Sequence, residues 1–162
     1  MVSGGEFDFI RTRLGPLTRN HAAALGLRDD AAVLDVPAGQ QMVLACDTLV
    51  AGVHFRVDDG AAVAAARAMR SNVSDLAAMG AQPLGYLSAL SWPRGIDPRW
   101  RDEFVAALAD EIDRAVSKGL MRGASGQDSN APPVVMPTAY GGAASAAPAT
   151  LAAAAAGCAA PS

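Results

Sequence analysis

Apolar side chains recur at helical spacing in two long stretches of the chain. Over residues 60–79 they return every three or four positions, and residues 97–116 repeat the same spacing. In the second stretch, Asp97 is a suitable N-cap and Pro98 suits the first turn of a helix. The pattern therefore predicts two amphipathic helices, each with one face buried and one face in water.

Shorter apolar runs surround these helices and have a different character. Residues 31–36 and 41–47 are two such runs on either side of a Pro/Gly break, which predicts a hairpin of two strands, and residues 84–91 predict a third strand. A short helix over residues 6–14 precedes them. This order of elements predicts an α+β fold, an α/β sandwich with helices on one face of a mostly antiparallel sheet.

The last part of the chain breaks these patterns. The 13 basic and 16 acidic residues all lie at or before Asp128, and beyond Tyr140 the sequence is mostly Gly, Ala, Ser and Pro. A short apolar run at residues 134–136 is the one strand signal there. Such a composition buries little apolar surface. We therefore expect one domain over residues 1–128 and a disordered, Ala-rich tail over residues 129–162.

Charge and cysteine content exclude several classes of function. With a net charge of −3, the chain lacks the basic face that binding to nucleic acid requires. It has neither the signals of a secretory leader nor an apolar run of spanning length, which favours a cytoplasmic protein that does not enter a membrane. Cys46 and Cys158 are too few for a disulfide framework and are expected to be reduced thiols.

Acidic residues lie at the edges of the predicted elements. Asp29 and Asp30 precede the first strand, Asp47 ends the second, and Asp75 lies in a polar interruption of the long helix. Converging carboxylates would suit a hard cation such as Mg²⁺, although each of these residues alone is as readily a cap or a surface acid. His54 follows Asp47 in a loop, where an imidazole can bind a phosphate or pack on the surface. The common phosphate-binding loops are absent from the sequence.

Three strings follow one another along the chain. They are Asp29-Asp30-Ala31-Ala32-Val33-Leu34, then Asp47-Thr48-Leu49-Val50-Ala51-Gly52-Val53-His54-Phe55, then Asn72-Val73-Ser74-Asp75-Leu76-Ala77-Ala78-Met79-Gly80-Ala81-Gln82-Pro83. In order and spacing they resemble the thiamine-monophosphate kinase family, and the resemblance extends over residues 5–116. That family shares its amino-terminal domain with aminoimidazole ribonucleotide synthetase and selenophosphate synthetase, so the resemblance implies this fold and a homodimer.

The resemblance also implies a reaction, the transfer of the γ-phosphoryl group of ATP to thiamine phosphate. It implies that Asp30, Asp47 and Asp75 bind Mg²⁺ ions that bridge the nucleotide phosphates, that Asp29 lies at the nucleotide, and that His54 contacts the thiamine phosphate. A general base is not expected, because the acceptor phosphate is already ionised and catalysis rests on metal ions and positioning.

The chain departs from the family pattern at three places. Family members carry hydroxyl residues before the aspartate of the second strand, where this chain has Ala45 and Cys46, so that Cys46 stands at a metal-ligand position although Mg²⁺ prefers oxygen. Arg28 replaces a glycine. The Gly-Gly-Asp-Thr string that binds ATP and metal is matched loosely around Asp128, which the resemblance makes a ligand of both.

Members of the family are about twice as long and use a second domain to close the active site. Two hypotheses therefore stand beside each other. In the first, the chain is a thiamine-phosphate kinase that uses ATP and Mg²⁺. In the second, it lacks the second domain and is an inactive fragment that only folds or dimerises.

Overall fold

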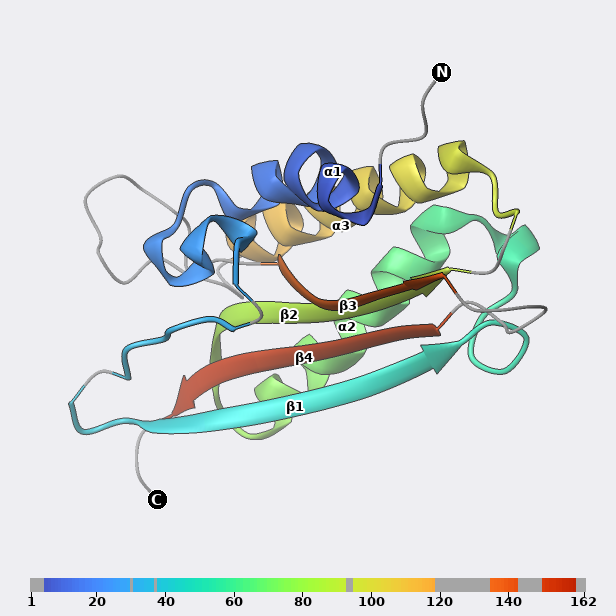
Figure 1. Cartoon of the computed structure of the whole chain (residues 1–162). Coiled ribbons are helices and arrows are strands. Elements are labelled where there is room, and N and C mark those ends of the chain that lie inside the picture. Colours follow the sequence, from blue (N-terminus) through green and yellow to red (C-terminus); the bar gives the residue numbers. More distant parts are fainter. Residues whose placement is uncertain are drawn as a thin grey trace.

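Two long helices pack against a four-stranded sheet in the computed structural model of the chain (Figure 1). The structure describes residues 5–29, 31–36, 38–92, 95–118, 135–142 and 150–159. The helices are α1 (Glu6–Phe9), which continues as a π-helical turn (Ile10–Leu14), α2 (Ala61–Ala78) and α3 (Pro98–Ser117). Short 3₁₀ turns lie at Gly15–Thr18, Ala22–Leu27 and Val57–Asp59. The three predicted helices are therefore confirmed.

The strands of the sheet are β1 (Gln41–Val50), β2 (Gln82–Trp92), β3 (Val135–Gly142) and β4 (Thr150–Ala159). Their order across the sheet is β1-β4-β2-β3. Strand β4 pairs antiparallel with both β1 and β2, whereas β3 pairs parallel with β2. The helices and strands together form an α+β fold, and the strands predicted at residues 41–47 and 84–91 are present as β1 and β2.

The predicted hairpin between residues 31–36 and β1 is wrong. Residues 31–36 form no strand, and the main-chain N–H of Val33 donates instead to the carbonyl of Ala23 at 3.2 Å. The antiparallel partner of β1 is β4, with Asp47 opposite Ala153. A segment from much later in the chain therefore takes the place that the local sequence assigned to residues 31–36.

The expectation of a disordered tail is wrong for residues 135–142 and 150–159, which form β3 and β4. Composition reports how much apolar area a segment can bury, but a strand inside a sheet is also held by main-chain hydrogen bonds along both edges. Strand β4 has neighbours on both sides. The domain boundary expected at residue 128 lies outside the described residues.

The main core lies between β2, α2 and α3. Phe104, Leu108 and Met69 are almost fully buried there, and the ring of Trp92 meets that of Phe104 edge to face at 5.5 Å between centroids. Burying a side chain as large as Phe104 stabilises the fold by about 3 kcal/mol. Since these residues join both helices to one strand, the core fixes the position of α2 relative to the sheet.

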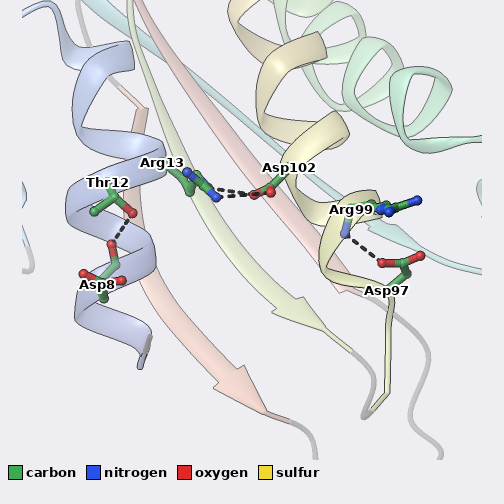
Figure 2. Close-up of polar contacts among 6 residues, drawn as sticks. All are labelled: Asp8, Thr12, Arg13, Asp97, Arg99 and Asp102. Atoms are coloured by element: carbon green, nitrogen blue, oxygen red, sulfur yellow. Dashed lines mark hydrogen bonds and ion pairs between the residues drawn. The ribbon is translucent and has the colours of Figure 1, made fainter. Parts of the chain in front are cut away.

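Polar contacts at the start of α3 support this packing (Figure 2). The Asp97 carboxylate accepts from the main-chain N–H of Arg99 at 2.9 Å, which confirms Asp97 as the N-cap. Arg13 reaches from the π-helical turn and donates to both carboxylate oxygens of Asp102, at 2.7 and 3.2 Å (Figure 2). Both partners are about half exposed, so this pair aligns the two helices and adds less than about 1 kcal/mol.

None of the helices in the described part of the chain is long and apolar enough to cross a bilayer.

Candidate functional site

A pocket of about 870 Å³ lies where the end of β1 and the following turn meet α2. Its lining residues come from these two places in the chain: Asp47, Thr48, Leu49, Val53, His54, Val63, Ala66, Arg67, Arg70 and Ser71. Two of the residues singled out from the sequence, Asp47 and His54, are among them. The structure therefore brings these two predicted site residues to one cavity.

The pleat of β1 directs Asp47 towards α2. Side chains along a strand alternate between the two faces of the sheet. Val43 and Ala45 pack against the buried cluster of Leu76 and Ala81, and Leu49 lies in the main core. Asp47 has the same parity as these residues and is half-buried. Its carboxylate is thus on the helix-covered face of the sheet, at the edge of the pocket.

Cys46 lies on the other face of β1. It is exposed with a free thiol, and Leu44, two residues earlier on the same face of the strand, is 72% exposed. A metal ion bound by Asp47 on the helix side is therefore on the wrong side of the strand for the thiol of Cys46. The structure does not bring these two predicted ligands together.

The turn after β1 presents His54. The main-chain N–H groups of Val53 and His54 both donate to the carbonyl of Val50, at 3.1 and 2.8 Å, and Gly52 closes the turn by donating to Phe55 at 2.7 Å. Gly52 has φ +81°, a left-handed conformation that favours glycine. Phe55 is 3% exposed and anchors the end of the turn in the core.

The ring of His54 is oriented by this same turn. The main-chain N–H of Val50 donates to Nδ1 of His54 at 2.9 Å. An imidazole that accepts at Nδ1 carries its proton at Nε2. His54 therefore offers an N–H donor at the pocket, which is the group that a phosphate oxygen would accept from.

Two arginines of α2 form the opposite wall. Arg67 and Arg70 are three residues apart and thus share one face of the helix. Nη1 of Arg67 donates to the main-chain carbonyl of His54 at 2.6 Å, which ties the turn to the helix. Arg70 donates through Nε and Nη2 to the two carboxylate oxygens of Glu111 in α3, at 2.8 and 2.6 Å.

Glu111 is a buried acid within a cationic group of side chains. Its residue is 7% exposed, and Arg114 approaches the same carboxylate at 3.7 Å. The hydrogen bonds from Arg70 lower the pKa of Glu111 below its ordinary value of 4.5, and the charges of Arg70, Arg114 and Lys118 act in the same direction against the effect of burial. Glu111 is therefore ionised at neutral pH.

The chemistry of the pocket favours a ligand with an anionic end and an apolar body. Two guanidinium groups and an N–H donor face a single carboxylate, Asp47, among the described lining residues. Val53, Val63 and Ala66 supply apolar surface beside them. Arginine binds phosphate and carboxylate groups well because its N–H groups match their geometry. A phosphorylated compound with an apolar part fits both sides of this lining.

The other predicted ligands do not join Asp47 here. Asp75 is exposed on α2 and does not line the pocket, and Asp29 lies in the segment before residues 31–36. Asp30 and Asp128 lie outside the described residues. Within the described ranges, no three His, Cys, Asp or Glu side chains gather as a metal site. Mg²⁺ nevertheless often uses one or two carboxylates together with substrate phosphates, which is a role that Asp47 fits.

Arg67, Arg70 and Glu111 are the residues that the sequence interpretation missed. The two arginines carry a usable signal, since basic residues three positions apart in a helix that follows a strand-end loop share one face. Glu111 carries none, because its partner Arg70 is far away along the chain and on another helix.

The comparisons with known proteins agree with this fold. A family described as AIR synthase related protein, N-terminal domain, matches residues 28–143, which is more than half of the chain. The chain belongs to this family. Curated relatives that the chain matches include proteins named thiamine-monophosphate kinase. The relative from Caulobacter vibrioides is 46% identical over 106 residues, which cover 65% of this chain and 30% of that protein.

Solved structures extend the likeness over most of the chain. Thiamine-monophosphate kinase from Stenotrophomonas maltophilia is 29% identical, with a TM-score of 0.59, and the match covers 99% of this chain and 43% of that one. A structure described as AaThiL complexed with AMPPCP and TMP has a TM-score of 0.58 at 20% identity, over 82% of this chain and 36% of that one. The chain spans about a third of the length of the curated relatives it matches.

Proposed function

We propose that this chain forms part of a phosphotransferase that uses ATP to convert thiamine phosphate into thiamine diphosphate. The observation that supports it best is the pocket in which Asp47 and His54, two residues of the family strings, lie opposite Arg67 and Arg70. The names of the relatives, and the AMPPCP and TMP bound in one similar structure, support ATP and thiamine phosphate as the substrates.

In this proposal the pocket holds thiamine phosphate. The N–H at Nε2 of His54 and the guanidinium groups bind the phosphate, while Val53 and Val63 contact the rings of thiamine. The acceptor oxygen is already ionised at neutral pH, so the protein needs no general base. Its task is to place this oxygen in line with the γ-phosphorus of ATP and to neutralise charge as the phosphoryl group moves.

Mg²⁺ would neutralise the charge of the nucleotide phosphates when it is bound. Asp47 is the residue of the pocket that fits this role, since its carboxylate lies on the same face of β1 as the cavity. Asp29, Asp30, Asp75 and Asp128 stay predicted nucleotide or metal ligands. Cys46 is not included in the proposed site, because it lies on the opposite face of the strand.

Binding without turnover is the second candidate function. The observation that favours it is the length of the match, since the chain spans about a third of the length of the curated relatives. A homodimer, implied by the family resemblance, stays a prediction for either candidate.

The test is to incubate the chain with Mg²⁺, ATP and thiamine phosphate and to measure thiamine diphosphate by chromatography. Asp47→Asn should abolish product, whereas Asp110→Asn, the same change at an exposed position of α3, should leave it unchanged. Thiamine phosphate that binds, as measured by calorimetry, without any product would exclude catalysis by this chain and favour the second candidate. Absence of both binding and product would contradict the proposed function.

A further inference from the structure

Among the described residues, Arg70 alone lines both the candidate site and a second hollow between α2 and α3. This smaller hollow, of about 300 Å³, holds Glu111, Arg114 and Lys118 on its walls. Glu111 does not line the candidate site. Among the described residues, Arg70 is therefore the side chain through which Glu111 can act by contact on a ligand there.

Glu111 binds only two of the three nitrogen atoms of the Arg70 guanidinium group. Nε and Nη2 bind the two carboxylate oxygens, and Nη1 has no partner among the described residues. The side chain of Arg70 is 59% exposed, while that of Glu111 is 9% exposed. A mostly exposed arginine samples many rotamers, but a bidentate bond to a buried carboxylate fixes the plane of its guanidinium group.

The charges around Glu111 also leave the wall cationic. Arg114 lies 3.7 Å from the same carboxylate, and Lys118 adds its charge to the hollow. The single negative charge of Glu111 is therefore shared among three cations, and Arg70 keeps much of its attraction for an anion. A closed one-to-one ion pair would have cancelled it.

We propose that Glu111 is a positioning residue for ligand binding, in that it holds Arg70 at the wall of the pocket with Nη1 directed to the phosphate group of the ligand. This inference rests on the proposed function, because it assigns the phosphate of thiamine phosphate to Arg70. The rotamer of Arg70 is selected when the protein folds, so binding does not have to order it.

The charge and the geometry of Glu111 predict opposite effects, which makes a sharp test. If Glu111 acted only as a negative charge near the pocket, Glu111→Gln would strengthen the binding of an anion. If it orients Arg70, the same isosteric change weakens the bidentate hydrogen bond to Arg70 and so weakens the binding of the anion. We expect about tenfold weaker binding of thiamine phosphate to E111Q, with the affinity for unphosphorylated thiamine unchanged.

Calorimetry with thiamine phosphate, thiamine and inorganic pyrophosphate separates the outcomes. Glu103→Gln is the matched control, since it makes the same charge change at an exposed position of α3 and should not weaken binding. If E111Q binds thiamine phosphate as tightly as the wild type or more tightly, the positioning role of Glu111 is overturned. The proposed function is not affected by that result. A wild-type chain that binds neither phosphate compound would overturn the proposed function and this inference with it.

A measurement on the wild-type chain guards against misfolding of the variant. The Nε–H resonance of Arg70, assigned by its loss in Arg70→Lys, should shift when thiamine phosphate is added and stay in place when thiamine is added. An Arg70 resonance that does not respond to thiamine phosphate would overturn the inference whatever the fate of E111Q.

Discussion

Arg67 and His54 are joined across the pocket by a hydrogen bond from Nη1 to the main-chain carbonyl, at 2.6 Å. The same histidine is held from the other side, where the N–H of Val50 donates to Nδ1 at 2.9 Å. One residue of the turn is thus attached both to the helix and to the end of the strand. The position of its ring follows from contacts that form on folding, before any ligand is present.

Removing the contact from the helix should loosen the turn. We expect Arg67→Met to lower the free energy of unfolding by about 1 kcal/mol, because one hydrogen bond from a charged group to a carbonyl is lost at an exposed site. Arg67→Lys keeps a donor of similar reach and should recover part of this loss. Chemical denaturation of both variants checks whether stability falls in the order wild type, R67K, R67M. An R67M chain as stable as the wild type would contradict the prediction.

Two substitutions of His54 separate its two nitrogen atoms. Asn places a side-chain oxygen near the position of Nδ1 and can still accept from Val50, whereas Gln places its amide nearer to Nε2. We expect His54→Asn to keep the stability of the wild type and to bind thiamine phosphate weakly. His54→Gln should bind better than H54N and be less stable by about 1 kcal/mol. Thermal unfolding and calorimetry measure the two effects, and the reverse ranking would refute the orientation of the ring.

The left-handed turn gives a prediction about backbone strain. Gly52 has φ +81°, and a Cβ added there would meet nothing within 4 Å. Gly52→Ala should therefore cost about 1 kcal/mol through conformation alone. Gly15 is the control, since its φ is −48° and a Cβ added there would meet only the carbonyl oxygen of Ile10 at 3.7 Å. Equal unfolding midpoints for G52A and G15A would contradict this prediction.

The ion pair between the helices should appear in the acid dependence of stability. Arg70 holds the pKa of Glu111 below its ordinary value of 4.5 in the folded chain. The resulting stabilisation is complete above that ordinary value and is lost as the pH falls through the lowered pKa. In denaturation series from neutral pH to about pH 3, the wild type should therefore lose stability more steeply than E111Q. Parallel curves would show that this pair does not contribute.

The helices of the fold could be predicted because their information is local. In α2 and α3 the apolar spacing, the N-cap Asp97 and Pro98 all lie within the element that they define. Residues 31–36 misled the interpretation, since an apolar run next to a Pro/Gly break suits a strand only if a free sheet edge is beside it. Strand β4 was missed because main-chain pairing decides its place, and alanine runs carry little strand signal of their own.

The candidate site, like the fold, could be predicted from the sequence only in part. Asp47 and His54 could be named because they follow a strand within a few residues of each other. Arg70 and Glu111 could not, since their pairing depends on how α2 crosses α3, which no local pattern encodes. Asp75 was predicted from the sequence as a site residue because it lies in one of the three family strings. It is not among the described residues that line the pocket.

The central position of β4 has a consequence for the order in which the molecule is built. Asp47 lies opposite Ala153, roughly 100 residues away along the chain, and β4 separates β1 from β2 in the sheet. During synthesis, the strand that carries Asp47 has to wait for residues 150–159 before it can join the sheet. The alanine-rich strand β4 therefore decides when the pocket can first exist.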